Sequence, residues 1–152
     1  MRFAPLAALT TIAVLALQSA PASASGGIGC EARDARVALD IGIGVTRGSG
    51  GFFSVAGTLE ITSTDLPGDL ASLALGDLLI HSWLDGEELK LQFYHERNEG
   101  EFASLDLLIE AERIDEGTYA GPYVVTVFGV DAASGSTGDT WSVEGSVLCY
   151  VE

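Results

Sequence analysis

Apolar and polar residues alternate along much of this chain with the period of two that is typical of half-buried β-strands. The same pattern over residues 37–45 and 53–61, with a glycine-rich turn between them, predicts a long hairpin. Residues 103–111 and 123–130 predict further strands. The last strand is predicted over Thr140–Glu152, where one face carries Trp141, Val143, Val147, Cys149 and Val151.

Two segments depart from this alternation. Residues 25–29 predict a short, flexible lead-in. After the break at Pro67-Gly68, Asp69 is a candidate cap for one or two helical turns, with Gly76 as the stop, although a strand fits this segment nearly as well.

Asp85-Gly86 lies between two apolar runs and is the strongest short hairpin signal in the chain. The sequence leaves the register of this hairpin open, and a shift of one residue exchanges the buried set for the exposed one. A two-residue turn places on the buried face Leu78, Ile80 and Ser82. A three-residue turn instead places there Leu79, His81 and Trp83.

The whole pattern gives about seven or eight short strands separated by glycine-containing and acidic turns. This predicts an all-β fold, either an antiparallel β-sandwich or a small β-barrel. The chain lacks the cysteine, tryptophan and tyrosine spacing of an antibody domain.

Residues 1–24 have the pattern of a secretory signal peptide, with Arg2 in the n-region, an apolar run over 4–17 and the cleavage site Ala22-Ser23-Ala24. The apolar run is too short to span a membrane, and no later run is longer. We therefore expect one exported β domain over residues 25–152, without a transmembrane segment, in the periplasm or secreted.

The chain has two cysteines, Cys30 and Cys149, which lie near the two ends of the expected mature domain. Export implies an oxidising compartment, in which such a pair forms a disulfide. The sequence therefore predicts a cross-link between the termini; the alternative is two unpaired buried thiols.

Acidic residues outnumber basic ones by 22 to 7, which gives a formal net charge of −15. Such a surface repels phosphate backbones and anionic membranes, so the charge excludes nucleic-acid binding. It fits a highly soluble protein, or one that attracts cationic partners or calcium.

Motifs of catalysis are missing from the sequence. There is no G-x-S-x-G nucleophile elbow and no phosphate-binding glycine loop. So many carboxylates are present that a hydrolase working through a pair of acidic residues, possible in principle, has no distinctive signal.

Three residues are candidates for ligand or partner contact: Tyr119 and Tyr123 on either side of a rigid Gly-Pro segment, and Arg47 in the glycine-rich turn. Displayed tyrosines are good binding anchors. The alternative is that both rings cap the core at one end of a sheet. The loops expected to form the binding end are 46–52, 115–123 and 131–139.

Loop 131–139 also offers oxygen ligands, with Asp131 and Asp139 at its ends. Calcium prefers such ligands, although the loop does not match the EF-hand pattern. Calcium is therefore the one cofactor that the sequence suggests.

Taken together, the sequence favours an exported, non-catalytic domain that binds an unidentified protein or small molecule. The alternatives are a small exported hydrolase that uses acidic residues, with or without calcium, and a structural component of the cell envelope.

Overall fold

The computed structural model describes residues 25–46, 51–129 and 140–152. These residues form nine strands and one short helix. In chain order the elements are β1 (Ser25–Arg33), β2 (Val37–Thr46), β3 (Phe52–Ile61), α1 (Gly68–Ala71), β4 (Ser72–Ala74), β5 (Leu79–Leu84), β6 (Glu88–Glu96), β7 (Ser104–Asp115), β8 (Thr118–Phe128) and β9 (Thr140–Val151). No helix in the described part of the chain is long and apolar enough to cross a membrane.

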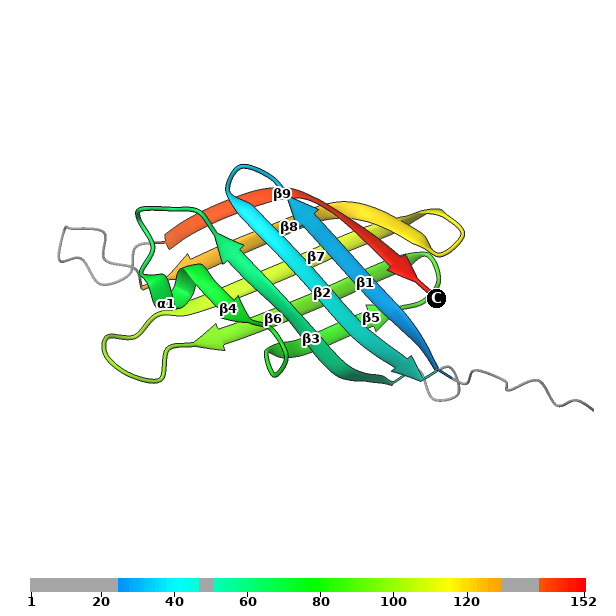
Figure 1. Ribbon diagram of the computed structural model, residues 1–152, viewed down its shortest axis with the longest axis horizontal. Helices are drawn as coiled ribbons and strands as arrows, with labels where there is room; N and C mark the ends of the chain where they lie inside the picture. The colour runs from blue at the N-terminus through cyan, green and yellow to red at the C-terminus, as the bar shows by residue number, and fades with distance from the viewer. Residues whose placement is uncertain (1–24, 47–50, 130–139) are drawn as a thin grey trace, which may run out of the picture.

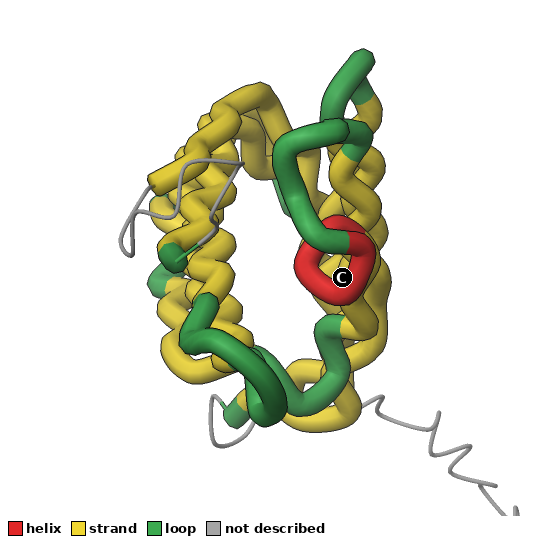
Figure 2. The backbone as a smooth tube through the Cα atoms, turned by 90° about the vertical axis from the view of Figure 1, so that its left-hand side faces the viewer, coloured by secondary structure: helices red, strands yellow, loops and turns green. Residues whose placement is uncertain are grey.

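The nine strands form one antiparallel sheet in the order β4-β3-β2-β1-β9-β8-β7-β6-β5. The sheet curls into a half-barrel, so that β1, β2 and β3 lie in front of β6, β7 and β8 in Figure 1 and the backbone traces a flattened ring in the end view of Figure 2. The predicted all-β antiparallel class is confirmed. The architecture is a single curled sheet, which is nearer to the barrel alternative than to two separate sheets.

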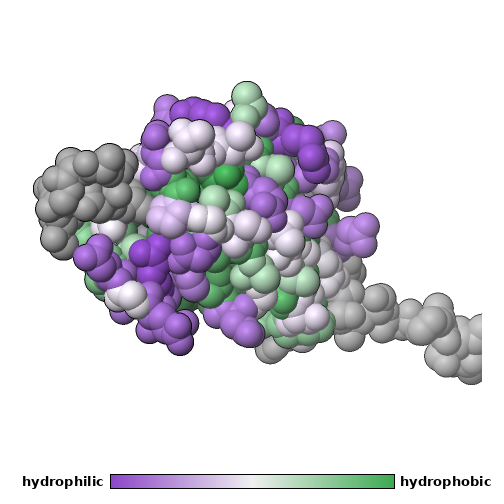
Figure 3. All heavy atoms as spheres, turned by 60° about the vertical axis from the view of Figure 1, so that its left-hand side comes forward, coloured by the Kyte–Doolittle hydropathy of each residue, from purple (hydrophilic) through white to green (hydrophobic). Residues whose placement is uncertain are grey.

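The core lies inside this curled sheet, where every second residue along a strand points its side chain inward. On β2 the buried residues are Val37, Leu39, Ile41 and Ile43, as the alternation predicts. No polar or charged residue in the described ranges is buried. On the outside, hydrophilic side chains are interspersed with apolar ones (Figure 3).

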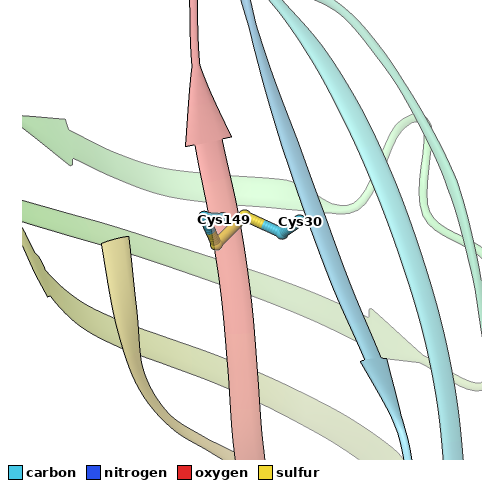
Figure 4. Close-up of a disulfide and its surroundings, with 2 residues drawn as sticks. All are labelled: Cys30 and Cys149. Carbon is cyan, nitrogen blue, oxygen red and sulfur yellow. A yellow bond between two sulfur atoms is a disulfide. The ribbon is translucent and has the colours of Figure 1, made fainter. Parts of the chain in front are cut away.

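The predicted disulfide between Cys30 and Cys149 is confirmed. It joins β1 to β9, which lie next to each other in the sheet, and the two cysteines are directly opposite in the ladder (Figure 4). The pairing between β1 and β9 covers only Ile28–Glu31 against Leu148–Val151, whereas the pairing of β8 with β9 runs from Thr118 to Phe128. The disulfide therefore reinforces the short pairing that joins the two halves of the sheet.

Two local predictions need correction. Residues 25–29 are not a lead-in but the first part of β1, because all five pair with β2, and Ile28 and Gly29 also pair with β9. The helix is only four residues long and starts after Pro67 without a side-chain cap. Asp69 instead binds Arg97, with contacts of 2.7 and 3.0 Å, and so ties α1 to the end of β6.

Candidate functional site

Tyr119 and Tyr123 both lie inside the barrel, with 4% and 0% of their surface exposed. The Tyr119 hydroxyl donates to the carbonyl of Gly86 at 3.1 Å, and the Tyr123 hydroxyl donates to the Asp34 carboxylate. This agrees with the alternative in which the rings cap the core. Neither ring is displayed as a surface anchor, because β8 directs both positions inward.

The contact between Tyr123 and Asp34 joins β8 to the turn between β1 and β2. The hydrogen bond from Tyr123, followed by those from the backbone of Arg36 and Val37, lowers the pKa of Asp34. Burial, followed by the hydrogen bond to Asp34 and then by the negative charge of Asp34, raises the pKa of Tyr123. Folding therefore favours an ionised Asp34 beside a neutral Tyr123.

These shifts predict a stability profile with two slopes. A lowered pKa at Asp34 stabilises the fold at neutral pH, and the stabilisation is lost as the pH falls through the acid range below about 4. A raised pKa at Tyr123 adds stability that is lost as the pH rises above about 10. We expect Tyr123→Phe to flatten both slopes, as measured by urea unfolding across the pH range.

The matched control for this prediction is Tyr94→Phe, which removes a hydroxyl bonded to Glu96 at the surface. It should leave the wild-type profile in place. A Tyr123→Phe variant with the wild-type slopes at both ends would contradict the assignment to this pair.

Three predicted site residues, Arg47, Asp131 and Asp139, lie outside the described residues. Calcium binding by the loop at 131–139 therefore stays a prediction. Within the described ranges, no group of three or more His, Cys, Asp or Glu side chains is placed to hold a metal ion.

A groove of about 580 Å³ opens where β1 and β9 diverge after their last pair, Glu31 and Leu148. Its polar rim includes Glu31, Arg33, Asp40 and Ser146. None of the large exposed apolar side chains lies along this groove. It has room for a ligand but offers no exposed aromatic anchor.

The surface around β5 has different properties, and we refer to it as the β5 surface: strand β5 with Lys90, Gln92 and Leu108 beside it. β5 is the last strand of the sheet, so its far edge has no partner strand within the part of the chain that the structure describes. Ile80 and Trp83 are 48% and 55% exposed on it. A shallow and mainly apolar hollow of about 240 Å³ lies against His81 and Trp83. Exposed apolar residues gathered at one place are typical of interaction sites.

The register of the hairpin between β5 and β6 differs from both predicted registers, because Leu84 pairs with Leu89, and a β-bulge interrupts β5. Ser82 and Leu84 nevertheless lie opposite Leu91 and Leu89, so their side chains face the side expected for the two-residue turn. The register then shifts between Leu79 and His81, so that Leu79 pairs with the buried Phe93 as in the other alternative. Trp83 therefore faces outward and lies opposite Lys90.

Three contacts, one from Tyr119 and two from Arg113, hold the turn at the end of β5. Gly86 adopts φ 94°, which favours glycine, and its carbonyl accepts the Tyr119 hydroxyl from inside the barrel. The Arg113 N–H donates to the Glu87 carbonyl at 2.9 Å, and the Arg113 side chain pairs with the Glu87 carboxylate. Buried Tyr119 thus supports the β5 surface from behind, a role that a sequence pattern cannot reveal because the two segments are far apart in the chain.

The free edge of β5 also directs backbone groups toward solvent. The Asp85 N–H donates to the Glu88 carbonyl at 3.3 Å, which defines a hydrogen-bonded pair. Such pairs alternate along an antiparallel ladder, so His81 and Trp83 bond to β6. Ser82 and Leu84 therefore point their N–H and C=O groups away from β6, toward the open edge.

The described carboxyl groups with a resolved pKa shift are Asp34, Asp69 and Asp85, and in each the pKa is lowered. The main cause of each shift is a hydrogen bond: Tyr123 donates to Asp34, Arg97 donates to Asp69, and the backbone N–H of Glu88 donates to Asp85. A glycosidase-type acid needs the opposite shift. The hydrolase interpretation gains no supporting group in this part of the chain.

The fold and these surfaces define the class of the molecule: an acidic, all-β domain in which a disulfide joins β1 to β9, adjacent strands from opposite ends of the chain. No protein-family model, curated protein or solved structure matches the chain.

Proposed function

We propose that this protein is an exported, non-catalytic binding domain that engages a protein partner through the β5 surface. The single observation that carries the proposal is the coincidence of an unpaired sheet edge with the exposed side chains of Ile80 and Trp83. Edge strands with exposed apolar residues tend to pair with other chains, and natural proteins usually shield them. Tryptophan is also among the residues that contribute most to binding energy.

Export to the periplasm or the medium is part of the proposal. It is supported by the signal-like pattern of residues 1–24 and by the disulfide between Cys30 and Cys149. In such a compartment the disulfide keeps β1 paired with β9 in the middle of the curled sheet, while the edge at β5 stays open to a partner.

The test uses the mature, oxidised domain as bait against the native cell envelope, with chemical cross-linking. We expect one partner at a stoichiometric level with the wild type, and loss of that partner from Trp83→Ala. The reason is that truncating a central aromatic anchor typically costs at least about 2 kcal/mol of binding energy, or roughly 30-fold in affinity.

The control bait is Tyr150→Ala, which removes an aromatic side chain of similar exposure, 46%, from β9. Both variants should keep the melting temperature of the wild type to within a few degrees. Equal recovery of the partner by Trp83→Ala and the wild type would contradict binding at the β5 surface.

A further inference from the structure

We infer that the β5 surface takes an extended, positively charged segment of another protein, which adds to the sheet as a strand beside β5. The inference rests on the proposed function and names the class of partner for that same surface. Three features of β5 support it: its free backbone groups, its apolar centre and its acidic ends.

The backbone of β5 provides a template for a further strand. Ser82 and Leu84 direct N–H and C=O groups toward the open edge, as the alternation of the ladder requires. The six residues of β5 span about 20 Å at ~3.3 Å each. Extended peptides bind other domains in this way, with affinity from main-chain hydrogen bonds and selectivity from alternate side chains.

Ile80 and Trp83 place apolar surface at the middle of this template. The exposed Trp83 lies over the hollow formed with Lys90 and Leu108 on the outer face. A strand added beside β5 directs every second side chain to that outer face, next to Trp83. The central residues of the bound segment are therefore expected to be apolar or β-branched.

The two ends of the same strand are acidic. Asp77 precedes β5, and Glu96 ends the neighbouring strand at the same end of the sheet; both are exposed. Asp85 follows β5, and hydrogen bonds from the backbone N–H groups of Glu88 and Glu87 lower its pKa, so it is ionised at neutral pH. The net charge of the whole chain is −15. Basic residues at both ends of a bound segment complement this pattern and speed its association.

The same charges disfavour a second copy of this chain as the occupant. If two β5 edges paired antiparallel, Asp77 of one copy would lie near Asp85 of the other. A parallel pairing would bring like acidic ends together as well. Like charges directly opposite each other destabilise a strand pair. The acidic ends of β5 therefore disfavour pairing with a second β5 edge and favour binding of a positively charged segment.

The experiment measures binding of three synthetic ten-residue peptides to the mature, oxidised domain by calorimetry. The first has two lysines at each end and an alternating Thr-Val centre. The second replaces the lysines with glutamates, and the third keeps the lysines but has prolines in the centre. We expect the first to bind, and the other two to bind at least about tenfold more weakly, since one loses the charge complementarity and the other the main-chain hydrogen bonds.

Two variants at one position separate strand addition from simple charge attraction. Ser82→Pro removes an N–H that points to the open edge and leaves the hydrogen bonds between β5 and β6 in place, so proline is compatible with this edge position. We expect it to weaken binding of the first peptide by about tenfold, since it both removes a hydrogen bond and blocks close approach. Ser82→Ala is the matched control and should bind as the wild type does. Melting temperatures of both variants show that the domain is folded.

The outcomes distinguish this inference from the proposed function. Equal binding of the lysine and glutamate peptides, or equal binding by Ser82→Pro and Ser82→Ala, would overturn the inference of a cationic added strand. Absence of binding by all three peptides would overturn it too. In each of these cases, loss of the native partner from Trp83→Ala would still support the β5 surface as the binding site. Concentration-dependent dimerisation of the free domain that Ser82→Pro abolishes would replace the cationic segment with a second copy.

Discussion

Removal of the disulfide is expected to destabilise the domain by about 4–5 kcal/mol, because the cross-link closes a loop of 119 residues in the unfolded chain. The variant is Cys30→Ala/Cys149→Ala, and the measurement is urea unfolding. The effect corresponds to a fall of roughly 15 °C in melting temperature for a domain of this size. The short pairing of β1 with β9 adds to this loop-closure entropy, because only four residue pairs hold the two strands together without the disulfide.

The control for the lost buried volume is Val147→Ala, which truncates a buried side chain on the same strand and leaves the cross-link intact. It should cost about 1–2 kcal/mol. Hydrogen exchange should also be faster in β1 than in β7 when the cysteines are replaced. A double variant that loses no more stability than Val147→Ala would contradict the importance of the cross-link.

Gly121→Ala is expected to cost about 3 kcal/mol or more, because a Cβ at this position would collide with the backbone of β7. It would lie 2.1 Å from the Glu110 carbonyl oxygen and 2.8 Å from the Cα of Ala111. Neither atom belongs to a flexible side chain, so the two strands must separate to accommodate it. The measurement is the free energy of unfolding in urea.

The control for this prediction is Gly42→Ala on β2, another strand glycine, where a Cβ would meet nothing within 4 Å. It should be neutral or slightly stabilising, since alanine reduces the entropy of the unfolded chain. Equal stability of the two variants would contradict the close approach of β8 to β7. The pair thus tests the packing of the strands rather than the general effect of replacing a glycine.

The β5 surface illustrates how an edge strand stays available without self-pairing. Its acidic ends repel a second copy, while its centre keeps apolar area exposed. Buried Tyr119 and the Arg113 pair fix the turn of the hairpin, so the template is preorganised. Preorganisation lowers the conformational entropy that the hairpin itself must lose when a partner binds.

The predicted site residues and the observed surface do not coincide. The sequence predicts Tyr119 and Tyr123 as contact residues because they flank a rigid Gly-Pro segment, but the curl of the sheet directs them inward. For Trp83 it predicts only one alternative position, on the buried face. A single bulge near Ile80 determines that it faces outward, and such a shift leaves no mark in a pattern of apolar and polar residues.

The sequence by itself determined most of the strands, most of the core positions and the disulfide, but not β1, whose first residues it predicted as a lead-in. Alternation over 37–45 or 140–152 is a local signal, because each side chain's face follows from its own backbone. The tertiary structure alone decided that β1 lies between β2 and β9, and that β5 ends the sheet. Whether a strand is central or at an edge depends on pairing with distant segments, and the candidate binding site is a consequence of that pairing.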